Sequence, residues 1–184
     1  MKKLVALMAA LVMLLSFAMA EETAVQEINF SDYVSEELQE TMGKYDKLTE
    51  DFPAMIWVLN DTFNMYDASG VPEELATGLE LGIFKFAADE SLFVIFSVLA
   101  NDGGSFDDLV ASLKEETDNF SNVQEAVING VRAVSYASAL TPGYTFATYA
   151  VFDDAWLNIM ATEGQNEEFA QAVSLISLSV KAAE

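Results

Sequence analysis

The residue types that most often carry catalysis are missing from this chain. It has no histidine and no cysteine. It therefore cannot form a Ser-His-Asp triad, supply a thiolate nucleophile or histidine base, or build an ordinary zinc site. Carboxylates remain, since 30 of the 184 residues are aspartate or glutamate, and a pair of them would suit glycoside hydrolysis. With so many acids, some pair falls at a suitable separation by chance, so we name no catalytic residue and keep a carboxylate-dependent hydrolase as an alternative.

A second kind of chemistry is suggested by acids around a glycine loop. The stretch "NDGGSFDD", residues 101–108, contains Asp102, Asp107 and Asp108. Calcium binds such oxygen clusters, but the spacing lacks the alternate ligands and the final glutamate of an EF-hand loop. Asp107 and Asp108 suit the start of a helix, which Ser105 can cap with Asp108 three residues on in a capping-box position. The acids at 153–154 suit a hairpin turn. We assign no metal ligand and no cofactor, and keep calcium-dependent adhesion or assembly as a further alternative.

Aromatic side chains and the chain's one arginine are the candidates for a binding site. Trp156, Tyr144 and Tyr149 lie in apolar runs, where aromatic residues fill a core or line a groove. Trp156 alternates with Asn158, so we expect part of that strand face to contact water. Arg132 is expected to pack its stem on apolar neighbours and to pair its head with an acid, and binding of an external carboxylate is the alternative. We take Trp156, Tyr144, Tyr149 and Arg132 as candidate ligand-binding residues.

Arg132 lies in "VINGVRAVSY", residues 127–136, which contains the strongest turn signal in the chain. The pair Asn129-Gly130 between apolar runs predicts a two-residue type I′ hairpin, because both central residues need a positive φ. In that register Ile128 faces Val131, and Arg132 lies on the strand leaving the turn.

The elements that must position these residues are mostly strands. Short connections between successive strands favour antiparallel pairing, and segregated helices favour an α+β fold. Runs that are apolar on both faces, such as Leu92–Leu99, predict a sheet covered by helices on both sides, an α/β/α sandwich. The predicted strands are 44–48, 54–59, 83–87, 92–99, 123–128, 131–140, 144–152 and 155–162. The predicted helices are 35–40, a short one that starts at 71–75, one at about 105–117, and one at about 166–181 with Lys181 at its end.

The first twenty residues are expected to be a secretory signal peptide. Lys2 and Lys3 precede an apolar run, and Ala18-Met-Ala20 is a small-x-small cleavage site. We expect an acidic segment at 21–43 and a single domain at 44–184, secreted and without a membrane anchor once the leader is removed. A net charge of −22 argues against nucleic acid and anionic membranes as partners, because both would repel the protein.

From about Ala54 to Lys181, some two-thirds of the chain, the order of segments resembles the PsbP/Mog-like family. The matching pieces are "AMIWVLNDTF" and "LFVIFSVL" for core strands, "SFDDLVASLKEE" and "FAQAVSLISLSVK" for helices, and "VINGVRAVSYA" for the hairpin. The likeness is greatest to small secreted proteins of anaerobic gut bacteria with no assigned activity. The resemblance implies an α/β/α sandwich that acts by binding. Relatives of this fold serve as an extrinsic photosystem II subunit or a partner of a small GTPase, and neither role carries over to residues of this chain.

These observations favour a secreted, noncatalytic binding or accessory protein whose partner is an unknown extracellular ligand or protein. Such a protein would have a pocket lined by aromatic and polar groups without clustered titratable residues. A hydrolase would instead bring two acids together in a cleft with pKa values shifted apart.

Overall fold

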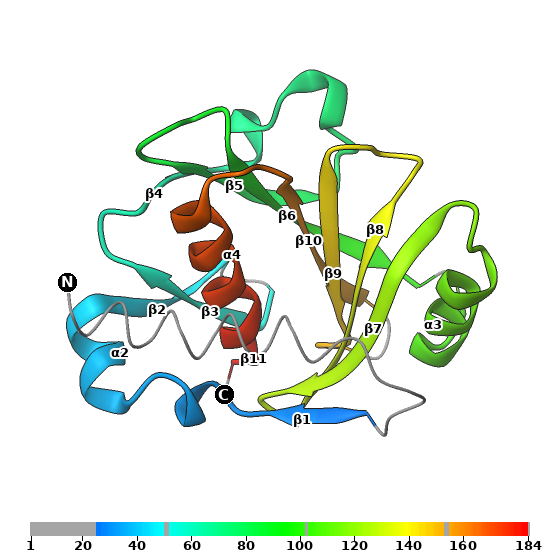
Figure 1. Cartoon of the computed structure of the whole chain (residues 1–184), viewed down its shortest axis with the longest axis horizontal. Coiled ribbons are helices and arrows are strands. Elements are labelled where there is room, and N and C mark those ends of the chain that lie inside the picture. Colours follow the sequence, from blue (N-terminus) through cyan, green and yellow to red (C-terminus); the bar gives the residue numbers. More distant parts are fainter. Residues whose placement is uncertain (1–24, 50–51, 102, 153–154, 184) are drawn as a thin grey trace.

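Two β-sheets and three α-helices make up the described part of the chain, residues 25–49, 52–101, 103–152 and 155–183, in a computed structural model (Figure 1). The expected leader, residues 1–20, lies outside the described residues. The elements in order are β1 (Gln26–Ile28), η1 (Phe30–Asp32), α2 (Glu36–Met42), β2 (Gly43–Lys47), β3 (Ala54–Leu59), β4 (Phe63–Tyr66), η2 (Ala68–Gly70), η3 (Glu73–Leu75), β5 (Glu80–Phe86), β6 (Phe93–Ala100), α3 (Phe106–Glu115), β7 (Phe120–Ile128), β8 (Val131–Ser138), β9 (Tyr144–Tyr149), β10 (Ala155–Thr162), α4 (Glu167–Ser179) and β11 (Lys181–Ala182).

The larger sheet has eight strands in the order β1-β7-β8-β9-β10-β6-β5-β4, and the smaller has three in the order β11-β3-β2. The α+β class predicted from the sequence is confirmed. The prediction of a purely antiparallel sheet is wrong, because β1 joins β7 in parallel. These two strands are far apart in the sequence, so no tight turn dictates their relative direction.

The hairpin predicted at Asn129-Gly130 is confirmed. Strands β7 and β8 pair with Ile128 opposite Val131, and the two turn residues have φ of 49° and 81°. Positive φ at both positions is what a type I′ turn requires, and Asn and Gly tolerate it best. This turn sets the register of β7 and β8, and thereby which of their residues face the interior.

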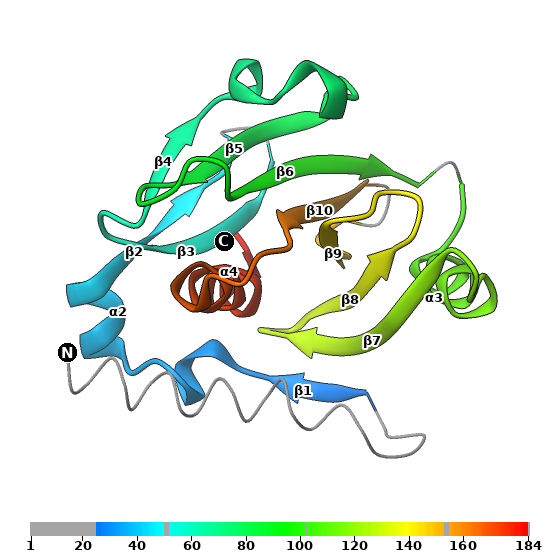
Figure 2. The same ribbon diagram turned by 45° about the horizontal axis from the view of Figure 1, so that its top comes forward.

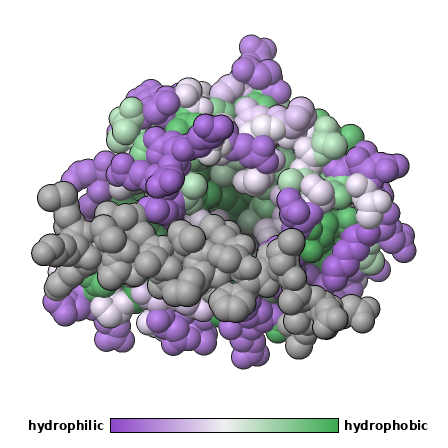
Figure 3. Space-filling view, in the orientation of Figure 1, coloured by the Kyte–Doolittle hydropathy of each residue, from purple (hydrophilic) through white to green (hydrophobic). Residues whose placement is uncertain are grey.

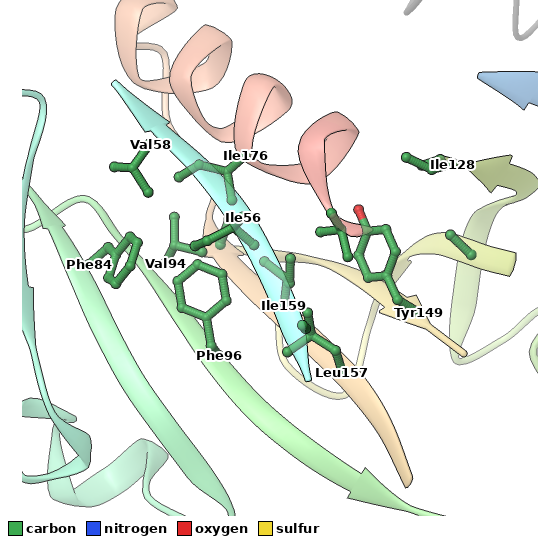
Figure 4. Close-up of a cluster of buried hydrophobic side chains, with 14 of the residues drawn as sticks. Ile56, Val58, Phe84, Val94, Phe96, Ile128, Tyr149, Leu157, Ile159 and Ile176 are labelled. Atoms are coloured by element: carbon green, nitrogen blue, oxygen red, sulfur yellow. The ribbon is translucent and has the colours of Figure 1, made fainter. Parts of the chain in front are cut away.

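The large sheet curves around α4, which lies on its concave side together with β3 (Figure 2). The main core fills this concavity, and Figure 4 shows residues of β3, β5, β6, β9, β10 and α4 converging there. Side chains of β10 alternate between the two faces, as expected for a strand. Its concave face and those of its partners contribute Phe84, Val94, Phe96, Leu157 and Ile159, which pack with Ile56 of β3 and Ile176 of α4.

The convex face of the sheet is covered in part by α3. Phe106 and Val110 of α3 pack against Val134 of β8 and Trp156 of β10. The predicted capping box is present, because the Ser105 hydroxyl accepts from the Asp108 N–H while the Asp108 carboxylate accepts from the Ser105 N–H at 2.8 Å. Apolar residues on both faces of the central strands are thus buried against different layers, which explains their lack of simple alternation.

The described part of the N-terminal segment packs on the domain. Phe30 is 1% exposed and Val34 is fully buried, in a cluster with Trp57 and Leu175. The Trp57 indole N–H donates to the Gln39 carbonyl at 2.9 Å. The domain boundary at residue 43 remains a prediction, but these contacts join the segment before it to β3 and α4 of the domain.

Some local predictions differ from the structure. The expected helix at 71–75 is reduced to the 3₁₀ turn η3 (Glu73–Leu75), and Lys181 lies in β11 rather than at the end of α4. Strands β1, β4 and β11 were not predicted, because each is too short to show periodicity. No helix among the described residues has the length and hydropathy needed to span a membrane.

Candidate ligand-binding cavity

A cavity of about 450 Å³ lies between α4 and the concave face of the large sheet at β7, β8, β9 and β10. Figure 3 shows the corresponding hollow, apolar in colour, near the centre of that face. Its lining includes Ile28 of β1 and both apolar and polar residues of α4. The residues that the strands and helix direct into it include Gln124, Ala126, Ile128, Ala133, Ser135, Thr145, Ala147, Tyr149, Ile159, Ala161, Val173, Ser174, Ser177 and Leu178.

Small side chains create this space. On β5 and β6 the concave face has phenylalanines, and Phe86 packs on Phe169 of α4 with ring centroids 5.5 Å apart. On β7, β8 and β9 several inward positions are alanines, with Ala126 opposite Ala133, and Ala147 opposite Ile159 of β10. One half of the concave face is therefore filled by aromatic rings, while the other half leaves room below α4.

Tyr149 forms the inner wall of the cavity. It is 1% exposed, and its hydroxyl donates to the Ser177 carbonyl of α4 at 2.6 Å. Burial raises the pKa of the Tyr149 hydroxyl above its usual value, so the side chain stays neutral at physiological pH. Figure 4 shows the ring reaching from β9 toward α4. This hydrogen bond helps to hold α4 at a fixed distance from the sheet.

Asn129, which follows the lining residue Ile128, forms a hydrogen-bond network that reaches the N-terminal segment and the end of α4. Its side-chain Nδ2 donates to the carbonyls of Leu178 and Val180, at 3.0 and 2.9 Å. Its Oδ1 accepts from the Phe30 N–H at 2.8 Å. The turn residue thus joins the hairpin to the end of α4 and to the N-terminal segment.

The opposite end of the cavity is polar. Gln124 and Ser135 face each other on β7 and β8, Thr145 lies further along β9, and Glu163 follows β10. The side chains of Gln124, Ser135 and Thr145 make no hydrogen bond within the part of the chain that the structure describes. They are available to a ligand in a site whose inner end is apolar.

The charged side chains among the described lining residues are two glutamates. Glu125 lies beside the cavity, but its carboxylate forms ion pairs with Lys114 and Arg132. Glu163 is exposed at the polar end. None of the described residues that line the cavity is lysine or arginine. Among the described residues of the lining, Glu163 is therefore the acid that forms no ion pair.

Arg132 and Trp156 lie together on the convex face, outside this cavity. The Arg132 guanidinium forms an ion pair with Asp107 at 2.7 Å and lies 5.3 Å from the Phe106 ring. Its hydrogen bond to Asp107 raises the pKa of Arg132. Trp156 is 5% exposed and packs edge-on to Phe106 at 5.5 Å. The expected packing and acid pairing of Arg132 are confirmed, and Trp156 is buried where contact with water was expected.

Tyr144 lies in a third place. Its ring packs on Phe93 at 6.1 Å, against a separate apolar cluster of β5 and β6. Of the four residues named from the sequence, Tyr149 alone lines the cavity. The lining residues that sequence reasoning missed are alanines and serines. Their signal was the recurrence of small residues at alternate positions in "AVSYASA" and "TFATYA", which strand periodicity places on one face.

The acids considered for calcium have structural partners where they are described. Asp107 pairs with Arg132, and Asp108 caps α3. Asp102 and the acids at 153–154 lie outside the described residues. Within the described ranges, no three acidic side chains gather in a way that would hold a metal ion.

Comparison with known proteins supports the fold. The solution structure of PsbP from the cyanobacterium Synechocystis sp. PCC 6803 superposes with a TM-score of 0.50, covering 77% of this chain and 92% of the other. The two sequences are 7% identical. A scan of protein-family models and a search of curated proteins both found no match. The chain thus has a PsbP-like α+β fold, and at this identity the likeness extends to the fold alone.

Proposed function

We propose that this chain is a secreted, noncatalytic binding or accessory protein, and that the cavity beneath α4 binds its small-molecule ligand. The leader-like residues 1–20 support secretion. The observation that supports binding is the cavity itself. It has a volume of about 450 Å³, is apolar within, and is edged by hydroxyl and amide groups that have no hydrogen-bond partner in the described part of the chain. Its volume lies in the range of typical small-molecule sites.

The proposal includes the finer form of the fold. We take the domain as a PsbP/Mog-type sandwich in which α3 forms one outer layer and α4, with the small sheet, the other. We also keep the likeness to small secreted proteins of gut anaerobes, on the segments quoted above. On this view α4 forms one wall of the site, and its own buried side chains Phe169 and Ile176 fix it to the main core.

Filling the cavity tests the proposal. Ala147 is only partly buried and faces the open space, so the ring of Ala147→Phe would enter the cavity rather than the core. The neutral dye N-phenyl-1-naphthylamine, which fluoresces in apolar surroundings, serves as the probe. We expect the wild type to bind it and Ala147→Phe to lose at least about tenfold in affinity, because the ring takes the volume of the ligand.

The matched control is Ala111→Phe, which places the same ring on the exposed face of α3. It should bind the dye as the wild type does. Thermal unfolding of each variant checks that the fold persists. Equal dye binding by Ala147→Phe and the wild type, with both folded, would show that the cavity is not the binding site.

A further inference from the structure

We propose that the cavity selects an elongated cationic amphiphile, with a flat apolar body lying over the alanines and a protonated amine at Glu163. This inference rests on the proposed function and adds the chemical class of the ligand. It follows from the order of side chains along the cavity and from the sign of the charge at its open end.

The inward rows of the sheet become more polar in one direction. Ala133 pairs with Tyr149 in the innermost row, which is apolar. The next row pairs Ser135 with Ala147, and the one after it pairs Ala137 with Thr145. Successive rows lie roughly 7 Å apart, because two residues of a strand separate them. A molecule lying along this direction would meet apolar surface first and hydroxyl groups after it.

Glu163 completes the gradient. It comes directly after β10, and its N–H donates to the Gly143 carbonyl, which continues the pairing of β10 with the β9 side. Because alternate residues of a strand share a face, Glu163 occupies the next inward position after Ala161. Its carboxylate is exposed and forms no ion pair among the described residues. An ammonium group attached to a body over Ala147 and Ala161 would reach this carboxylate.

The lining also disfavours anions. Its described residues include no lysine or arginine to neutralise a carboxylate or phosphate, and the protein carries a net charge of −22. Burying an unpaired anion beside Glu163 would cost both desolvation and repulsion. The cavity therefore discriminates by charge as well as by shape.

Three probes that share a naphthalene ring and differ in charge test the inference: the amine 1-naphthylmethylamine, the alcohol 1-naphthylmethanol and the carboxylate 1-naphthaleneacetate. Each is titrated by calorimetry at neutral pH and low salt. The wild type should bind the amine most tightly and the carboxylate least. Because the pair with Glu163 is solvent-accessible, we expect the amine to exceed the alcohol by about two- to fivefold. Glu163→Gln should remove that difference and raise the relative affinity of the carboxylate. Glu115→Gln removes the same charge from an exposed site on α3 and should leave the order unchanged.

The outcomes separate the two proposals. One outcome is that the probes bind the wild type but not Ala147→Phe, while the affinity for the carboxylate equals that for the amine or Glu163→Gln leaves the affinities unchanged. The cavity then binds ligands, and the proposed cationic class is wrong. If binding is absent, or is insensitive to Ala147→Phe, the proposed function fails, and the inference fails with it. High salt should narrow the preference for the amine, since the pair with Glu163 is screened.

Discussion

Asn129 contributes to stability in two ways: its backbone adopts the positive φ of the hairpin turn, and its side chain makes hydrogen bonds to other segments. Substitutions at this position separate these two contributions, which the sequence alone cannot distinguish. Its backbone adopts a φ of 49°, and its side chain makes three hydrogen bonds, to the Phe30 N–H and to the carbonyls of Leu178 and Val180. Asn129→Gly keeps the backbone freedom and removes the side-chain bonds. Asn129→Ala removes both. Asn129→Asp keeps the acceptor but turns an anionic oxygen toward two carbonyls.

The magnitudes follow from these contacts. Each hydrogen bond contributes about 1 kcal/mol net, so Asn129→Gly should lower the free energy of unfolding by about 2–3 kcal/mol after allowing for water at this half-buried site. Asn129→Ala adds roughly 1–2 kcal/mol, because alanine is strained in the left-handed region. Asn129→Asp should be no more stable than Asn129→Gly, since its carboxylate cannot donate. The free energies would come from urea unfolding followed by circular dichroism.

Asn122 provides the matched control. It also has a positive φ, of 56°, but its side chain makes no hydrogen bond to the described residues. Asn122→Gly should therefore be nearly neutral, and Asn122→Ala should cost only the backbone strain. An Asn129→Gly protein within about 0.5 kcal/mol of the wild type would refute the reasoning, because the side chain would then contribute nothing beyond the turn.

Two further predictions concern stability. Ser179 is fully buried, and its hydroxyl accepts from the backbone N–H of Trp57 at 2.8 Å, so Ser179→Ala should lower the free energy of unfolding in urea by about 1–3 kcal/mol because that donor loses its partner. Ser174→Ala removes an exposed hydroxyl of the same helix and should have little effect. Equal losses in the two variants would contradict this assignment. Hydrogen bonds from the Ser105 N–H and hydroxyl lower the pKa of Asp108. The contribution of the Asp108 carboxylate to stability is therefore present above the ordinary carboxyl pKa of about 4 and is lost as pH falls through the lower pKa of the folded state. The difference in free energy of unfolding between wild type and Asp108→Asn should shrink toward pH 3. A difference that stays constant with pH would argue against this linkage.

Local signals predicted the local structure well. The Asn-Gly turn and the capping box at Ser105 each depend on a few adjacent residues whose chemistry allows one arrangement. The errors arose where partners are distant in sequence. β3 has the apolar composition of a central strand, and it is the middle strand of the small sheet, between β11 and β2, rather than a strand of the large sheet. Its own residues do not encode that choice, because the backbone N–H of Trp57 donates to the hydroxyl of Ser179, the last residue of α4.

The cavity was hidden from the sequence for a related reason. Strand periodicity correctly places Ala133 and Ala147 on the inward face, but inward alanines are equally suited to a close-packed layer. What leaves space over them is the position of α4, and contacts elsewhere determine that position. Phe169 rests on the phenylalanines of β4 and β5 at one end of the helix, while Asn129 and Tyr149 hold the other end. A helix held at both ends over a floor of methyl groups cannot settle onto it, so the binding volume is a property of the whole domain rather than of any segment.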